Sequence, residues 1–194
     1  YQAYENNQRD MYRTGGQTNV NFALSNSGEL GSFRLSYNYR DYDAITLNAD
    51  NKAHQFAFSA DLKANDWVKV KWNTNYSNTR DHNAHYAMQS FATYGFPRNM
   101  DLNLIKQNYL TPDGYNLFSM DQSIGQKAPY VGRFGSYYWS QEVNSNMVER
   151  NHLIQSLNLD VTFNDKFSWT TLGGMDWTVT DQEVKQHVSK PLSM

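Results

Sequence analysis

The chain has 194 residues, a formal net charge of −2 and no cysteine. This charge gives no electrostatic case for nucleic-acid binding, and the absence of thiols excludes disulfide scaffolds, thiolate metal sites and cysteine nucleophiles. Charged residues make up 19% of the chain whereas aromatic residues reach 15%, a balance expected when many strands alternate polar with aromatic side chains. No apolar run is long enough to predict a transmembrane helix.

Alternating polarity begins after an N-terminal stretch, residues 1–16, that has no period and is predicted to be a loop. The first predicted strand spans residues 18–25, and a turn at 26–31 leads into the second, at 31–41. This second strand has two unlike faces: Phe33, Leu35, Tyr37 and Tyr39 lie on one, and Arg34, Ser36, Asn38 and Arg40 on the other.

The same alternation returns in four further stretches, which predict strands at 53–63, 67–79, 148–163 and 167–180. Ile154 and Gln155 break it once. Within a long insertion at 80–147, residues 87–94 predict a short helix and 109–114 a turn. An insertion of this length usually serves a function in a compact protein.

The connections sort by length, which indicates how the strands are arranged. The turns at 26–31, 64–66 and 164–166 are short, whereas the loops at 41–51 and 80–147 are long. In an up-and-down meander this places short turns at one rim and long loops at the other. Most of the strands also reach the 9–11 tilted residues that cross a bilayer. Aromatic residues gather near both ends: Trp67, Phe167 and Trp169 beside short turns, Tyr39 and Tyr76 toward long loops.

These features predict an all-β fold, an antiparallel up-and-down transmembrane β-barrel segment with periplasmic turns and extracellular loops. Six strands cannot close such a barrel, which starts at about 8 strands. The chain is therefore expected to be part of a longer polypeptide, as its start at Tyr1 and its end at Met194 also suggest. Two alternatives remain open: a soluble or surface-exposed β-sandwich that binds glycans, with the apolar face as its core, and a structural or adhesive barrel without a transport role.

Several of these stretches resemble one family. Arg13-Thr-Gly15, the strand from Gln17 to Ser25, and Phe33-Arg-Leu-Ser-Tyr-Asn-Tyr-Arg40 resemble the start of the barrel in SusC/RagA TonB-dependent outer-membrane transporters. The hairpin around Asp66-Trp-Val-Lys-Val and the stretch Phe167-Ser-Trp-Thr-Thr-Leu-Gly-Gly174 are similar to later parts of that barrel.

The resemblance implies six strands of the N-terminal portion of a barrel of about 22 strands, with residues 80–147 forming an extracellular loop. It also implies that a plug domain, which contacts TonB, and the rest of the barrel lie outside this chain. The implied function is TonB-energised import of an oligosaccharide or peptide across the outer membrane of a Gram-negative bacterium. The implied partners are a SusD-like surface lipoprotein and outer-membrane lipid.

The predicted functional residues belong to surfaces rather than to an active site, because no catalytic, cofactor or phosphate-binding motif occurs. On the wall, the following are expected to face the lumen or the plug: Arg34, Asn38, Arg40, Asn73, Asn75, Asn158 and Asp160. In the insertion, an exposed aromatic patch is expected at Tyr137, Tyr138 and Trp139, which with Tyr94 and Phe96 would contact substrate or a partner.

Two possible metal sites are interpreted as solvated loop residues. His82 and His85 have helical i, i+3 spacing but no accompanying carboxylate motif. The acidic loop that contains Asp41, Asp43 and Asp50 lacks the spacing and glycine of an EF-hand.

Overall fold

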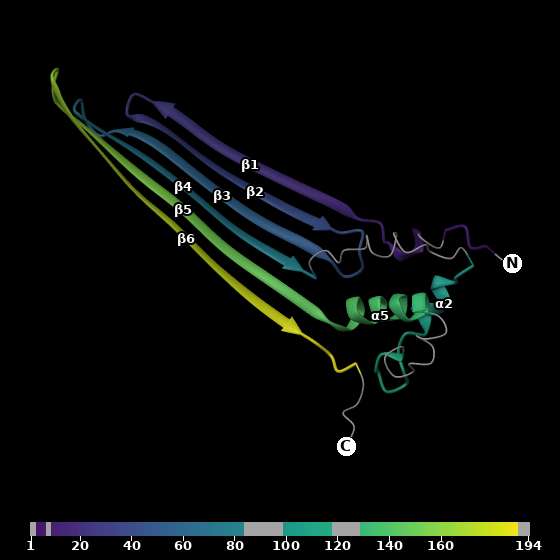
Figure 1. The fold of residues 1–194 in the computed structure, drawn as a ribbon. Helices are drawn as coiled ribbons and strands as arrows, with labels where there is room; N and C mark the ends of the chain where they lie inside the picture. Colours follow the sequence, from purple (N-terminus) through teal and green to yellow (C-terminus); the bar gives the residue numbers. More distant parts are fainter. Residues whose placement is uncertain (1–2, 7–8, 84–98, 118–128, 190–194) are drawn as a thin grey trace.

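The computed structural model describes residues 3–6, 9–83, 99–117 and 129–189. All six strands in these ranges belong to one antiparallel sheet in the order of the chain, and they run side by side as an up-and-down meander (Figure 1). The strands are β1 (Gly16–Gly28), β2 (Gly31–Asp43), β3 (Asp50–Lys63), β4 (Val68–His82), β5 (Ser145–Asn164) and β6 (Phe167–Lys185). The sheet is open: within the described ranges, β1 and β6 each pair on one side only.

Short turns join the strands at one end of the sheet, and their sequences explain their geometry. Gly31 has a φ of 131°, and a Cβ there would lie 2.0 Å from the carbonyl oxygen of Asp61, so the first turn requires glycine. In the other two turns an asparagine side chain accepts a hydrogen bond from the backbone N–H two residues later, at Asn65 and Asn164. These Asx turns fix the tight reversals.

At the other end of the sheet the chain forms a small helical cap. It consists of a 3₁₀-helix (Arg9–Met11), the β2–β3 loop at 44–49, α2 (Leu102–Gln107) and α5 (Pro129–Val143). Asp101 caps α2, because its carboxylate accepts from the backbone N–H groups of Asn103 and Leu104. A buried apolar cluster joins the three helices, so the cap, unlike the sheet, has a hydrophobic core of its own. No helix among the described residues combines the length and the hydropathy needed to cross a lipid bilayer.

The structure confirms the six strands and their order, and it extends most of them. β3 begins three residues earlier than predicted and β6 ends five residues later. The turn predicted at 109–114 is present, closed by a bridge between Leu110 and Asn116. The predicted helix at 87–94 lies outside the described residues.

Three details differ from the sequence-based expectations. The N-terminal stretch contains the 3₁₀-helix, and α5 occupies part of the insertion where no helix was predicted. The residues that break the alternation, Ile154 and Gln155, cause no irregularity in the ladder, because both pair in continuous register. The register shift of β5 lies instead at Thr162–Asn164.

Candidate transmembrane and polar faces

The strand register places most of the large apolar side chains of the six strands on one face of the sheet, although Ile154 and Leu172 lie on the other. We call this set the apolar band: Val20, Phe22, Leu24, Phe33, Leu35, Tyr37, Tyr39, Phe56, Phe58, Leu62, Val68, Val70, Trp72, Tyr76, Leu153, Leu157, Leu159, Val161, Phe163, Phe167, Trp169, Met175, Trp177 and Val179. Nothing in the described structure forms a second layer over it. Phe22 stays 59% exposed, Leu157 50% and Trp177 49%. A contiguous apolar surface of this size is typical of a site that contacts a membrane or another protein layer.

The height of the apolar band matches the apolar part of a membrane barrel. On β5 it runs from Leu153 to Phe163. Ten residue steps of about 3.3 Å, tilted by about 40°, span about 25 Å, which is the height of the lipid-facing band in outer-membrane barrels. Within these limits the face carries no Asp, Glu, Lys or Arg.

Toward the long loops, the same face carries a row of charged residues. We call this row the upper charged row; it crosses β2 to β6 as Asp41, Lys52, Arg80, Glu149 and Asp181. Lys52 Nζ lies 3.6 Å from Asp41 Oδ2. This face of the sheet therefore changes from apolar to charged at this row.

Tyrosine side chains lie at this boundary with a common direction. Each hydroxyl makes a hydrogen bond one register row nearer the long loops: Tyr37 with His54 Nδ1 (2.9 Å), Tyr39 with Asp41 Oδ2 (2.9 Å) and Tyr76 with Asn151 Oδ1 (2.8 Å). The rings therefore cover the apolar band while the hydroxyls point to its polar edge. This is the arrangement of an interfacial aromatic girdle.

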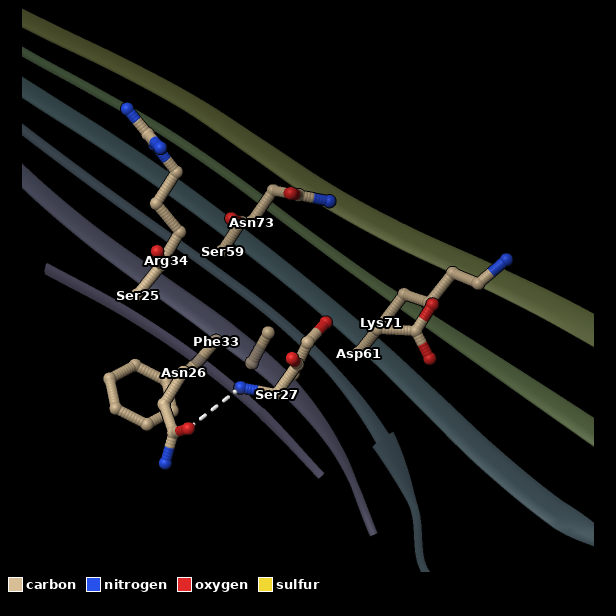
Figure 2. A pocket seen from close by; sticks show the side chains of 11 residues that line it. Ser25, Asn26, Ser27, Phe33, Arg34, Ser59, Asp61, Lys71 and Asn73 are labelled. Carbon is tan, nitrogen blue, oxygen red and sulfur yellow. Dashed lines mark hydrogen bonds between the residues drawn. The ribbon is translucent and has the colours of Figure 1, made fainter. Parts of the chain in front are cut away.

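The opposite face of the sheet is polar, and it carries all seven residues predicted to line a lumen: Arg34, Asn38, Arg40, Asn73, Asn75, Asn158 and Asp160. Several are held by cross-strand hydrogen bonds. Asn38 Nδ2 donates to Gln55 Oε1 at 3.2 Å, and Asp160 Oδ1 accepts from Thr170 Oγ1 at 2.8 Å. In a shallow hollow on this face, Arg34 and Asn73 point away from Phe33, which belongs to the apolar band (Figure 2).

Charge on the polar face increases toward the short turns. Near them lie Lys63, Lys69, Lys71, Asp61 and Asp160, whereas one central row reads Asn21, Asn38, Gln55 and Ser77. The central row offers neutral hydrogen-bond donors and acceptors to a polar molecule. The charged residues near the short turns offer ionic contacts to a protein segment.

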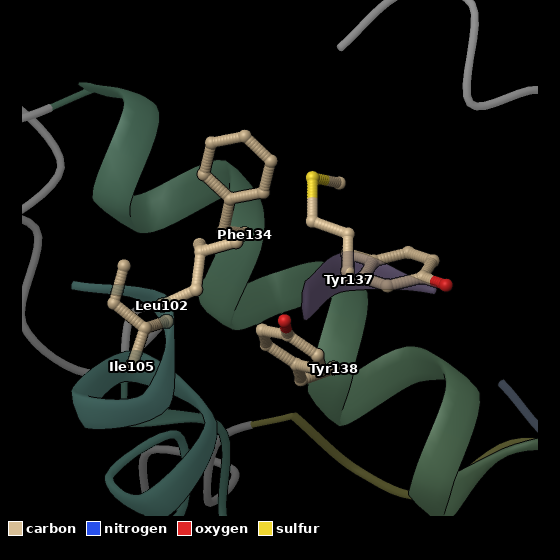
Figure 3. Packing of buried hydrophobic residues seen from close by; sticks show 6 residues of the cluster. Leu102, Ile105, Phe134, Tyr137 and Tyr138 are labelled. Carbon is tan, nitrogen blue, oxygen red and sulfur yellow. The ribbon is translucent and has the colours of Figure 1, made fainter. Parts of the chain in front are cut away.

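The expectation of an exposed aromatic patch at Tyr137, Tyr138 and Trp139 is wrong. These side chains are only 2%, 1% and 5% exposed. Tyr137 and Tyr138 pack with Phe134 of α5 and with Leu102 and Ile105 of α2 (Figure 3). Burial raises the pKa of the Tyr138 hydroxyl to about 12. Tyr137 and Tyr138 therefore hold the cap together, and the Trp139 ring contacts His187. Tyr94 and Phe96 lie outside the described residues.

Arg13, which sequence reasoning noted only as part of a resemblance, organises the β2–β3 loop. Its Nε donates to the carbonyl oxygens of Ala44 (2.8 Å) and Thr46 (3.1 Å), and its Nη2 donates to that of Ala49 (2.7 Å). A Cβ at Gly15 would lie 2.8 Å from the carbonyl oxygen of Asp43. The arginine therefore holds the loop, and the glycine permits the close approach.

Two asparagines connect the cap to the strands. Asn48, at a φ of 50°, donates through Nδ2 to the carbonyl oxygen of Gln141 at 3.0 Å, which ties the β2–β3 loop to α5. Asn83, at a φ of 47°, exchanges two 2.8 Å hydrogen bonds with Asn146 across the base of the insertion. Asparagine tolerates this left-handed backbone conformation. The sequence alone could not show which of the chain's many asparagines adopt it.

The acidic loop residues considered as calcium ligands have basic side chains as partners in the structure. Asp43 lies 3.6 Å from Arg13 and Asp50 3.0 Å from His82. Among the described residues, no three His, Asp or Glu side chains are grouped so that they could hold a metal ion.

Comparison with known proteins does not assign the chain to a family. No protein-family model matches it, and no curated protein sequence matches it.

Proposed function

We propose that this chain is a wall segment of an outer-membrane β-barrel in a Gram-negative bacterium, with the apolar band facing lipid and the polar face facing the lumen. The observation that carries the proposal is the uncovered apolar band. It is free of charged side chains over about 25 Å. At its long-loop end lie the row of tyrosines and the upper charged row.

The open edges of the sheet support a larger barrel. A free strand edge presents unpaired backbone groups, which a hydrocarbon environment does not tolerate. In the proposed protein β1 and β6 therefore pair with further strands, which complete a barrel of about 22 strands. The long-loop end with the cap is extracellular, and the short-turn end is periplasmic.

Within this barrel the proposed activity is TonB-dependent import of an oligosaccharide or peptide. The resemblance to SusC/RagA transporters supplies this part of the proposal, together with a plug domain, TonB and a SusD-like lipoprotein as partners. The neutral amides on the polar face can form hydrogen bonds with a polar nutrient as it passes. The charged residues near the short turns can form ion pairs with a plug domain. The cap offers an ordered platform for the lipoprotein.

Cysteine labelling in intact outer membranes tests the membrane assignment, and the chain contributes no background thiol. Leu157→Cys lies in the apolar band, Glu149→Cys in the upper charged row and Asn158→Cys on the polar face. A membrane-impermeant maleimide is expected to label Glu149→Cys and to spare Leu157→Cys, which a lipid-soluble maleimide labels. Equal aqueous labelling of Leu157→Cys and Glu149→Cys would refute the lipid-facing assignment. Protection of Leu157→Cys from both reagents, in a protein that stays in solution without detergent, would instead favour the glycan-binding sandwich with the apolar face as its core.

Deletion of residues 100–140 tests the transport assignment separately. It removes most of α5 and all of α2, and it is expected to abolish lipoprotein association and nutrient uptake while the barrel remains resistant to unfolding in cold detergent. Unchanged association and uptake would refute the proposed role of the insertion.

A further inference from the structure

The polar face has a hollow near its centre, where β1 to β5 lie side by side (Figure 1); we call it the neutral hollow. Its volume of about 580 Å³ is within the range of small-molecule sites. Among the described residues, no Asp, Glu, Lys or Arg lines it. Its polar side chains come from two adjacent register rows: Asn21, Ser36, Asn38, Gln55, Asn75, Ser77 and His152. The hollow nearer the short turns (Figure 2) differs, because Arg34, Asp61 and Lys71 line it. The neutral hollow therefore favours an uncharged ligand.

The carboxamides of the neutral hollow keep free hydrogen-bonding groups. Asn38 Nδ2 donates to Gln55 Oε1 at 3.2 Å, which orients both side chains and leaves Asn38 Oδ1 and Gln55 Nε2 available. The side chains of Asn21 and Asn75 are exposed and make no hydrogen bond with another described residue. Each carboxamide offers both donors and an acceptor, and so does a hydroxyl group. A ligand with many hydroxyl groups can therefore pair with all four carboxamides.

The spacing of these side chains distinguishes an oligosaccharide from a peptide. Asn21, Asn38 and Gln55 lie in one register row on neighbouring strands, and neighbouring strands are about 4.8 Å apart. An extended peptide advances by about 3.3 Å per residue, or about 6.6 Å between side chains on the same side. Neither of these distances matches the row. An extended chain of pyranose rings repeats at close to one strand spacing, so successive rings can reach successive carboxamides.

An apolar side chain at the β5 end of the neutral hollow also fits a sugar ring. Ile154, which breaks the alternation of β5, is 42% exposed on the polar face and lines the hollow. Beside it, His152 Nε2 lies 2.9 Å from Asp176 Oδ1, which holds the imidazole in place. A pyranose ring is polar at its hydroxyl groups and apolar on its C–H faces. Packing one C–H face against Ile154 removes both apolar surfaces from water.

We propose that the neutral hollow binds an uncharged, extended oligosaccharide, whose rings lie across β1 to β5 and whose hydroxyl groups pair with the carboxamides. The row spans about 19 Å between β1 and β5, which accommodates about four rings. This inference rests on the function proposed above and deepens it, because it selects the oligosaccharide over the peptide as the nutrient.

Isothermal titration calorimetry of the full-length protein in detergent tests this site. The probe is cellotetraose, an extended and uncharged tetrasaccharide. It is compared with tetragalacturonate, a charged tetrasaccharide, and with N-acetyl-tetraserine amide, an uncharged peptide that also carries hydroxyl groups. The wild-type protein is expected to bind cellotetraose about tenfold more tightly than either comparison ligand.

Two substitutions in the neutral hollow and one matched control locate the binding. Asn38→Ala removes one carboxamide and releases Gln55, so it should weaken cellotetraose binding about tenfold. Ile154→Ser removes the apolar contact and should weaken binding severalfold. Asn73→Ala removes an exposed asparagine of the same face that lines the charged hollow instead, and it should bind cellotetraose as the wild type does. Ile154→Ser, at an exposed position, keeps the site testable if Asn38→Ala does not fold.

Absence of cellotetraose binding to the wild-type protein, or equal affinity in all three variants, would overturn the oligosaccharide site. Equal affinity for the serine peptide or for tetragalacturonate would overturn the selection of an uncharged oligosaccharide. None of these results changes the cysteine labelling of the apolar band, so the site can fail while the membrane assignment stands. Conversely, aqueous labelling of Leu157→Cys would overturn the membrane assignment and leave the cellotetraose result unaffected.

Discussion

An arginine placed at Leu157 gives the most direct energetic test of the apolar band. Leu157 lies four residue steps from Leu153 and six from Phe163 on β5, so at about 3.3 Å per step and a tilt of about 40° it lies about 10 Å and 15 Å from the two edges. It is thus close to the bilayer midplane. Leu157→Arg should cost about 2–4 kcal/mol of unfolding free energy, the range for a cation at the midplane of a lipid-facing wall.

The measurement is reversible urea unfolding of the full-length protein in lipid vesicles, with two matched variants on the same strand. Glu149→Arg places the charge in the upper charged row, and Asn158→Arg places it on the polar face; both should change stability by less than about 1 kcal/mol. In bilayers with shorter acyl chains, arginine at Leu153 should become less costly, because that position moves into the interface. A cost for Leu157→Arg no larger than for Glu149→Arg, or no response to bilayer thickness, would refute the lipid-facing assignment.

Three further predictions concern the cap. Arg13→Ala should raise the rate of amide hydrogen exchange in residues 44–49 about 30-fold, equivalent to about 2 kcal/mol of lost charge-assisted hydrogen bonding. Arg9→Ala, at an exposed position, should leave the rate unchanged. An unchanged rate in Arg13→Ala would show that Arg13 does not hold the loop. Gly15→Ala should destabilise the same loop by about 1–3 kcal/mol through overpacking. Gly16→Ala, whose Cβ would meet nothing within 4 Å, should have little effect. Equal effects of the two substitutions would contradict the steric argument. Because burial raises the pKa of Tyr138 from 10.0 to about 12, its neutral form stabilises the cap fully below pH 10, and this stability is lost as the pH rises through 12. Tyr138→Phe removes a buried hydroxyl that has no hydrogen-bond partner among the described residues, so it should stabilise the cap by about 1 kcal/mol and abolish that alkaline loss. Identical alkaline unfolding curves of the two proteins, followed by near-UV circular dichroism, would count against this prediction.

Strand periodicity predicted the sheet because each strand carries its own two-faced pattern, independent of what surrounds it. The alternation in Phe33–Arg40 defines a strand and its faces without knowledge of its neighbours. It could not give the strand ends, because the strands continue past the apolar band into polar rows such as the one through Lys52 and Arg80, where polarity no longer alternates. Hydrogen bonding to neighbouring strands, which sequence pattern does not report, sets those ends.

The cap was harder to predict because its burial depends on segments distant in the sequence. Tyr137-Tyr-Trp139 was interpreted as a patch of adjacent aromatics, yet the buried residues Phe134, Tyr137, Tyr138 and Gln141 follow the i, i+3, i+4, i+7 spacing of a helix face. That spacing could have identified α5. Its packing against Leu102 and Met11, about 35 and 125 residues earlier in the chain, could not have been inferred from local pattern.

The paired hydrogen bonds between Asn83 and Asn146 have a consequence for how this protein can vary. They bring the two ends of a long excursion to a single point on the wall, so the strands below them keep their register whatever the intervening chain contains. Residues 84–143 then form a cassette: evolution, or an engineer, can lengthen, shorten or replace it with the polypeptide of another protein and leave the sheet intact. The same pair of asparagines marks where the cuts for such an exchange belong.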